Sequence, residues 1–287
     1  MSLQTLDLSS NKFVKISNGT FQAVPRLQRL ILSANSITEL EESSFDPLET
    51  VEEIRLDRNH LVTVPEGTFR HNRRLRTLVL SHNHLRHVNG LLSDLPSLVD
   101  VDLGFNYLLS VGNSAFTGSR ELRSLNLQHN VLYEIANDAF KPLQKLSKLT
   151  LSHNFLSRVT DETFQHNIGL AELYLDNNMI RTIEPGALKG TPRLRKLKLE
   201  SNLLREVVRE LFAGQVGGER GPETMKDTLL SPQAALVELS LEDNKLAAIQ
   251  PHSFSSLSSL KFLDLRGTIS CSTSRRCCTL MRFWQPL

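Results

Sequence analysis

Apolar and polar residues alternate over short stretches that recur along almost the whole chain. One such stretch, LRTLVLSHNHL, ends on an asparagine, a polar residue and a leucine, and similar stretches align with it without gaps from Leu3 to about Gly267. Strict alternation predicts a short β-strand with leucines directed inward and variable residues directed outward. We therefore expect about eleven repeats, each of which contributes one strand.

An asparagine follows each expected strand at a regular spacing. Successive asparagines are 24 residues apart, except for a step of 23 to Asn106 and a step of 42 to Asn244, and Thr268 takes the eleventh place. A side-chain amide at this point satisfies backbone groups that no sheet pairs. We predict a buried structural ladder, with no catalytic role, made of Asn11, Asn35, Asn59, Asn83, Asn106, Asn130, Asn154, Asn178, Asn202 and Asn244.

A phenylalanine stands ten residues after most of these asparagines. One ring per repeat predicts a packed core on the far side of each coil rather than a cofactor-binding stripe. The fourth repeat lacks its phenylalanine and is one residue short, so we expect Leu92 or Leu95 to fill that place. Leu188 replaces the phenylalanine once. The remaining members are Phe21, Phe45, Phe69, Phe116, Phe140, Phe164, Phe212 and Phe254.

The combined pattern resembles the leucine-rich repeat, LxxLxLxxNxL, and the 24-residue unit with its phenylalanine resembles the "typical" subclass of that family. The resemblance implies an α/β solenoid, the leucine-rich repeat horseshoe, with one parallel strand per repeat on the concave face and an irregular or short helical convex side. The subclass occurs mostly in extracellular receptors, adhesion proteins and matrix proteins. The resemblance therefore implies an extracellular or cell-surface protein that binds a protein ligand.

Cysteine-free repeats also fit a second reading, a cytoplasmic leucine-rich repeat scaffold or regulatory adaptor. A signal peptide and a cysteine-rich cap upstream would support the extracellular alternative. The first strand begins at Leu3 with no cap before it, and a bare edge strand invites aggregation. We therefore expect further repeats, a cap and a signal peptide to precede Met1 in a longer protein.

All three cysteines lie within residues 268–287, which follow the repeat array. This segment weakly resembles the cysteine-containing cap of extracellular repeat arrays, but it lacks the Asn-Pro step and the usual cysteine spacing. We interpret it as a degenerate or truncated cap, and the alternative is sequence that has left its reading frame. Three cysteines without a histidine do not make a four-ligand zinc site, so we expect no metal there.

The longest interruption of the pattern lies between Phe212 and Leu236. Deletion of residues 216–233 restores the normal repeat length. The ends of this segment are compatible with splice-site codons, which suggests a short intron retained in frame, and the alternative is a natural flexible insertion. On either interpretation we expect one undivided array over residues 1–267.

Composition and motifs narrow the function. A net charge of +2 gives no general argument for a nucleic-acid partner. No apolar run approaches the length of about eighteen residues that spans a membrane, although a longer protein could contain one. No nucleophile elbow, phosphate loop or zinc-protease helix is present. We expect a non-catalytic protein-binding module without a cofactor.

The outward positions of the central strands are the candidate ligand site. An exposed, Arg-bearing and aromatic surface is typical of a protein-binding region. Three histidines directly precede a ladder asparagine, and His129 and His153 should lie on adjacent strands, within reach of a shared metal or of a pH-dependent contact. The alternative is that histidine is simply a tolerated polar surface residue at this position of the repeat. Basic residues also gather at Arg195, Lys196 and Lys198. The proposed site residues are Arg55, Arg58, Val79, His82, Asp102, Phe105, Asn126, His129, Thr150, His153 and Tyr174.

A single glycosylation sequon, Asn18-Gly19-Thr20, is present. We expect it on a convex-side loop, away from the concave face.

Overall fold

The computed structural model describes residues 3–88, 90–207, 211–212, 235–249, 253–254 and 256–268. The chain forms two compact units, Met1–Asn154 and Phe155–Leu287, which we describe separately as unit 1 and unit 2. The expected insertion at residues 216–233 lies outside the described residues. So does the expected cap, except for Thr268 at its start.

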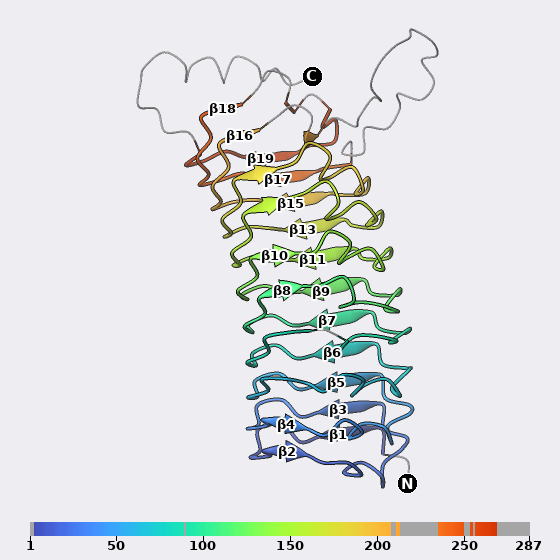
Figure 1. The fold of residues 1–287 in the computed structure, drawn as a ribbon. Coiled ribbons are helices and arrows are strands. Elements are labelled where there is room, and N and C mark those ends of the chain that lie inside the picture. The colour runs from blue at the N-terminus through green and yellow to red at the C-terminus, as the bar shows by residue number, and fades with distance from the viewer. Residues whose placement is uncertain are drawn as a thin grey trace, which may run out of the picture. The chain divides into compact units, whose positions relative to one another are not determined.

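Each unit is a solenoid of parallel strands in which every repeat adds one three-residue strand to a main sheet (Figure 1). The main-sheet strands of unit 1 follow in the order β1 (Thr5–Asp7), β3 (Arg29–Ile31), β5 (Glu53–Arg55), β6 (Thr77–Val79), β7 (Asp100–Asp102), β9 (Ser124–Asn126) and β11 (Lys148–Thr150). Those of unit 2 are β13 (Glu172–Tyr174), β15 (Lys196–Lys198), β17 (Glu238–Ser240) and β19 (Phe262–Asp264).

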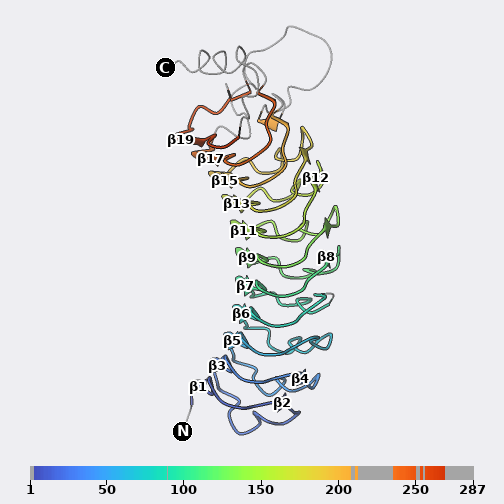
Figure 2. The same ribbon diagram turned by 90° about the vertical axis from the view of Figure 1, so that its left-hand side faces the viewer.

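Two-residue strands form a second set on the return path of the coils. In unit 1 they are β2 (Lys15–Ile16), β4 (Glu39–Leu40), β8 (Ser110–Val111) and β10 (Glu134–Ile135). In unit 2 they are β12 (Arg158–Val159), β14 (Thr182–Ile183), β16 (Glu206–Val207) and β18 (Ala248–Ile249). In unit 1 they pair β2 with β4 and β8 with β10. Figure 2 places β2, β4 and β8 across the coil from the main-sheet strands of unit 1.

The strand register follows the sequence repeat. Leu6 pairs with Leu30 in the ordinary 24-residue step. Across the 23-residue step, Leu78 pairs with Val101, so the residue that the fourth repeat lacks relative to the others is missing outside the strand. The 42-residue step likewise keeps the sheet continuous within unit 2, because Leu197 pairs directly with Leu239. The additional residues of that repeat therefore leave the pairing of β15 with β17 intact.

The asparagine ladder is present in both units and works as the sequence predicts. The amide nitrogen of Asn130 donates to the carbonyl oxygens of Leu103 and Leu127, at 3.0 Å each. Its side-chain oxygen accepts a hydrogen bond from the backbone nitrogen of Leu108, also at 3.0 Å. The ladder asparagines from Asn35 onward are buried. Asn11 is exposed, contrary to our expectation, because no coil of this chain stacks on its outer side.

Leucine and phenylalanine side chains fill the space enclosed by each coil. The inward leucine at the centre of a main-sheet strand is fully buried in most repeats, as Leu78 and Leu197 illustrate. The phenylalanines stack from coil to coil, with ring centroids 5.3 Å apart between Phe45 and Phe69. In the fourth repeat, Leu92 and Leu95, the two leucines expected near the place of the missing ring, are both fully buried.

Turns connect the short strands, and no α-helix occurs among the described residues. The return path is therefore irregular, in agreement with the predicted fold class. Within the same residues, no helix has the length and apolarity needed to cross a bilayer.

Candidate ligand-binding face

The residue before each ladder asparagine has a left-handed backbone conformation. Its φ lies close to +55° in every repeat, for example 52° at His129 and 55° at His153. This conformation is unusual outside glycine, asparagine and aspartate, and it turns the chain sharply out of the strand. Side chains at this position therefore leave successive coils in the same direction, which makes the position a natural site for a column of surface groups.

Four rings occupy this position on successive coils of unit 1 and stack face to face. The ring centroids lie 4.2 Å apart between His82 and Phe105, and 4.3 Å apart between Phe105 and His129. His129 and His153 are 4.0 Å apart, with planes only 9° from parallel. All four side chains are exposed. The expected neighbourhood of His129 and His153 is confirmed, and Phe105 and His82 extend their stack.

A second column, which the sequence analysis missed, lies two residues further along each coil. It contains His60, His84 and Tyr107, with centroid distances of 5.5 Å and 5.7 Å. We call the seven rings of both columns the ring edge. The second column could have been found in the sequence, because the residue just after the ladder asparagine is histidine or tyrosine in three successive repeats. We considered only the residue before each ladder asparagine and missed the residue after it.

An apolar hollow of about 550 Å³ adjoins the second column. It is lined by Val62, His84, Arg86, Tyr107, Leu109 and Val131. Val62, Tyr107 and Leu109 are exposed to between 39% and 52%, which is unusual for three apolar or aromatic neighbours on one surface.

A polar hollow of about 340 Å³ lies on the outward face of the central strands of unit 1. Its lining contains four predicted site residues, Val79, Asp102, Asn126 and Thr150. The Asn126 amide donates to an oxygen of Asp102 at 2.8 Å, and the backbone nitrogen of Gly104 donates to the same oxygen at 3.0 Å. These bonds hold the Asp102 carboxylate in place within the lining of the hollow.

Glycine at position 104 keeps this hollow open. A Cβ atom added there would lie 3.0 Å from the Asn126 amide nitrogen and 3.2 Å from the bonded oxygen of Asp102. A larger residue would therefore disturb the polar lining. We call the lining of this hollow, which includes the predicted site residues Val79, Asp102, Asn126 and Thr150, the strand face of unit 1.

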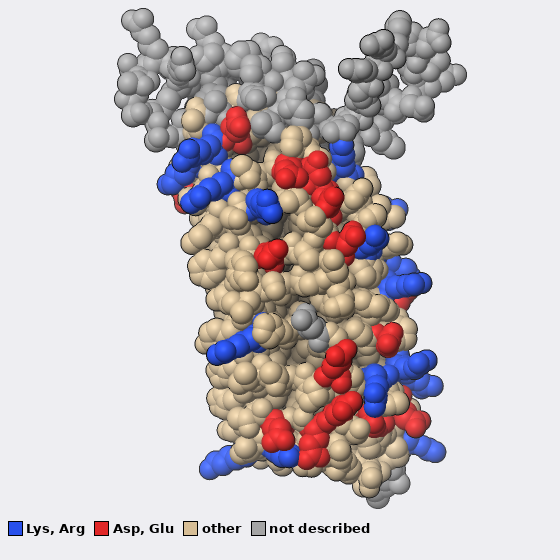
Figure 3. Space-filling model, viewed as in Figure 1, with Lys and Arg blue, Asp and Glu red and all other residues tan. Residues whose placement is uncertain are grey.

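Some arginine side chains of unit 1 form ion pairs with carboxylates and others do not. Arg55 donates to Glu53 at 2.7 Å, and the same carboxylate accepts from Arg29 at 2.9 Å. Arg58 and Arg86 are exposed and have no ion-pair partner among the described residues. Acidic and basic side chains both appear on the face in view in Figure 3, so that face does not have a single sign.

Tyr174, the remaining predicted site residue, belongs to unit 2. Its hydroxyl donates to Glu172 at 2.9 Å, and the Lys196 ammonium lies 5.7 Å from the centre of its ring. Burial raises the pKa of Tyr174 to about 12, and the hydrogen bond to Glu172 adds to the shift. The phenol is therefore held neutral as a hydrogen-bond donor.

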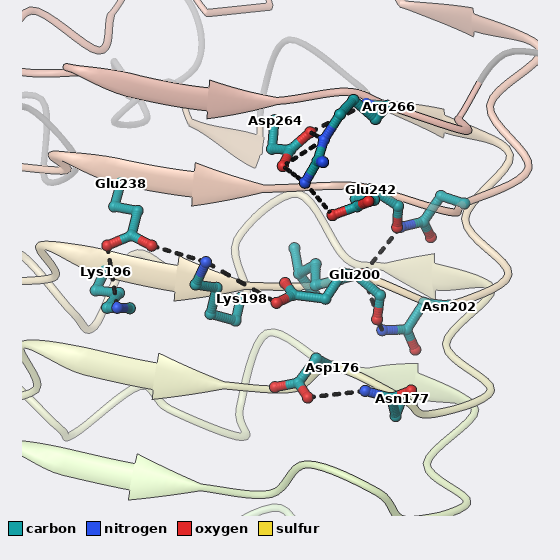
Figure 4. Close-up of polar contacts among 12 residues, drawn as sticks. Asp176, Asn177, Lys196, Lys198, Glu200, Asn202, Glu238, Glu242, Asp264 and Arg266 are labelled. Carbon is teal, nitrogen blue, oxygen red and sulfur yellow. Dashed lines mark hydrogen bonds and ion pairs between the residues drawn. The ribbon is translucent and has the colours of Figure 1, made fainter.

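Ion pairs offset Lys196 and Lys198, two of the three basic residues that the sequence places together in unit 2, whereas Arg195 is exposed and has no ion-pair partner among the described residues. Glu238 accepts from Lys198 at 2.7 Å and from Lys196 at 3.1 Å, as Figure 4 shows. The hydrogen bond from Lys198, followed by that from Lys196, holds the pKa of Glu238 below its ordinary value. Arg266 is similarly engaged by Asp264 and Glu242. The cluster predicted from Lys196 and Lys198 is thus a compensated network rather than a free basic patch.

Asn18 lies in the turn that follows β2, and its side chain is exposed. Its side-chain oxygen accepts from the Ser43 backbone nitrogen at 3.2 Å, while its amide nitrogen donates no hydrogen bond among the described residues. This nitrogen is the atom that glycosylation modifies. Within the described part of the chain, no group of three or more His, Cys, Asp or Glu side chains is arranged to hold a metal ion.

The leucine rich repeat family model matches residues 1–61, 49–108, 96–156 and 144–204. The chain therefore belongs to the leucine-rich repeat family. No curated protein matches it.

Solved structures with the same fold include receptor proteins in complex with their ligands. A chain of the TLR13–ssRNA13 complex is 25% identical with a TM-score of 0.77, and the match covers 93% of this chain and 40% of that one. A chain of the Drosophila Toll–Spatzle complex is 21% identical with a TM-score of 0.58, covering 85% of this chain and 38% of that one. The glycosylated form of that complex gives 22% identity and a TM-score of 0.65, with coverage of 93% and 41%. This chain thus spans about two fifths of the length of these relatives.

Proposed function

We propose that this chain is a non-catalytic protein-binding module that belongs to the ectodomain of an extracellular receptor, adhesion or matrix protein. The observation that carries the proposal is the strand face of unit 1, where a polar hollow lies beside an exposed column of rings. These side chains contribute nothing to the core, yet they form a continuous and well-defined surface.

The physics of the fold supports a binding role. Buried leucines and the asparagine ladder hold the strands, so the outward side chains start from a rigid frame. A preorganised surface binds with a smaller loss of conformational freedom than a flexible one. A few central anchors, such as Phe105 or His129, then contribute most of the binding free energy. The leucine-rich repeat solenoid is typically a binding scaffold, and the relatives above were solved with ligands bound.

A protein ligand fits this face better than a nucleic acid, even though TLR13 was solved with a single-stranded RNA. Asp100 and Asp102 line the hollow together with Lys148, so a phosphate backbone would meet charges of both signs there. Nucleic-acid sites usually present a surface of one positive sign. A protein surface with its own mixture of charges meets no such conflict.

The test is a binding screen of the whole chain against a library of secreted proteins and receptor ectodomains, with an oligonucleotide included. Hits are then remeasured with Asn126→Arg, which blocks the hollow, and with Thr117→Arg, which places the same charge at an exposed turn on the return path. We expect the first variant to abolish binding and the second to retain it. Retained binding by both, or a hit for the oligonucleotide alone, would contradict the proposal.

Extracellular residence has an independent test at Asn18. Expression through a secretory pathway should add a glycan that peptide N-glycosidase removes, and Asn18→Gln should abolish the shift. An unmodified Asn18 in a secreted, folded chain would remove this support for the location.

A further inference from the structure

We propose that the ring edge of unit 1 binds an acidic segment of a protein ligand and that this contact strengthens as the pH falls. The inference rests on the proposed function, because it names the kind of partner that the same face recognises. It also makes a separate claim, since the strand face could bind a protein without any contribution from the ring edge.

The first support for this inference is the concentration of ionisable rings. Five of the seven rings are imidazoles, and they come from only five successive coils. Imidazole is the side chain whose charge most readily changes between about pH 5 and pH 8. Stacked cations repel each other, most strongly for His129 and His153 with centroids 4.0 Å apart. A bound anion relieves that repulsion and favours protonation, so binding and proton uptake reinforce each other.

The second support is the uncompensated charge next to the rings. Arg58 occupies the same backbone position as the first ring column, one coil before His82, with a φ of 56°. Arg86 lines the apolar hollow beside His84. Neither guanidinium has an ion-pair partner among the described residues. Elsewhere on the main sheets, by contrast, Arg29, Lys198 and Arg266 each pair with a carboxylate.

The coils of the ring edge carry further charged groups besides Arg58 and Arg86. On the preceding coil, Asp57 is engaged by the Ser33 hydroxyl at 2.6 Å. Asp102 lines the polar hollow, bonded to Asn126 and Gly104. Lys148 on β11 adds a further positive charge to the wall of that hollow.

The third support is the apolar hollow, which specifies the partner further. Val62, Leu109 and Val131 form its apolar walls, and the Arg86 side chain reaches its lining. Carboxylates of a ligand would meet Arg58, Arg86 and the protonated imidazoles, while an apolar side chain would enter the hollow. The fitting ligand is therefore a peptide segment in which acidic residues flank an apolar one. A bare polyanion leaves the hollow unfilled.

The test uses the whole chain and a fluorescent peptide of glutamate and leucine residues, with a glutamine-for-glutamate peptide as the matched control. Anisotropy titrations at about pH 5.5 and about pH 7.5 give the two dissociation constants. We expect the glutamate peptide to bind about tenfold more tightly at the lower pH, because several imidazoles gain charge over that range. The glutamine peptide should bind weakly and without pH dependence.

Two variants assign the effect to the ring edge. His129→Asn combined with His153→Asn keeps the left-handed backbone, since Asn177 holds the same position with a φ of 54°. This double variant should lose most of the pH dependence, and Arg58→Asn should weaken binding at both pH values. Arg74→Asn, at an exposed position on the return path, is the control and should change neither.

The outcomes separate this inference from the proposed function. Equal binding of both peptides, a pH dependence unchanged in the double variant, or tighter binding of a single-stranded oligonucleotide than of the glutamate peptide would each overturn the ring-edge proposal. If a library ligand still bound wild type and lost binding with Asn126→Arg, the proposed function would stand while the ring-edge proposal failed.

Discussion

The imidazole rings of His129 and His153 lie face to face, 4.0 Å apart and 9° from parallel, on neighbouring coils of unit 1. Both residues have left-handed backbone conformations. The stack is therefore a product of the backbone turn that precedes each ladder asparagine, and it tells us which substitutions each position accepts.

A β-branched residue at position 129 should destabilise the coil. His129→Val forces a bulky side chain into the left-handed region, where we expect a loss of about 1–2 kcal/mol in the free energy of unfolding. His129→Asn fits that conformation and should cost far less. Urea denaturation of the two variants makes the comparison. Equal losses would mean that the ring contacts, and not the backbone, dominate stability at this position.

Removal of one ladder amide should be costly. Asn130→Ala leaves the buried backbone nitrogen of Leu108 without its partner and removes one of the two side-chain amide donors to each of the carbonyl oxygens of Leu103 and Leu127, which Asn106 and Asn154 also reach. We expect a loss of about 1–3 kcal/mol, since buried polar groups without partners carry a penalty of that size. Gln144→Ala, which removes an exposed side-chain amide from the same unit, serves as the control. Wild-type thermal stability of Asn130→Ala would contradict the structural role of the ladder.

The asparagine ladder and the leucine core could be predicted because the same pattern of leucines and asparagine occurs in nearly every repeat. Ten aligned asparagines leave little choice about where Asn130 lies, and buried leucines fix the strand register. Individual surface contacts lack that redundancy. The two stacked columns depend on a backbone turn whose left-handed φ no single repeat reveals, although Asn177 and Asp243, residue types that tolerate this conformation, stand at that position. The ion pairs of Glu238 with Lys196 and Lys198 could not be predicted in the same way. They depend on the pairing of β15 with β17, whose separation in the sequence is not the regular 24 residues.

Unit 2 should lose stability in acid through Glu238. Its pKa is lowered in the folded state, first by Lys198 and then by Lys196, so its contribution is present above the ordinary carboxyl pKa. That contribution disappears as the pH falls through the lowered value. The difference in melting temperature between wild type and Glu238→Gln should therefore be large at neutral pH and shrink below about pH 4. Glu206→Gln, at an exposed carboxylate, is the control, and a difference independent of pH would contradict this account.

Tyr174 should lose its proton at a higher pH than an ordinary tyrosine. Its pKa of about 12 exceeds the ordinary tyrosine value because burial and Glu172 disfavour the phenolate. The associated stability is complete below about pH 10 and is lost as the pH rises toward the folded-state value. An ultraviolet titration should show a phenolate step near pH 12 that Tyr174→Phe removes and Tyr133→Phe retains. Loss of that step in the Tyr133 variant would show that the assignment is wrong.

The central claim is that the strand face of unit 1 is the surface that meets a protein ligand, and photo-crosslinking tests it most directly. A benzophenone amino acid is placed at position 126, on the strand face, or at position 117, on the return path, and the chain is irradiated with a ligand from the binding screen. We predict a covalent adduct from position 126 and none from position 117. An adduct from position 117 alone would contradict the account.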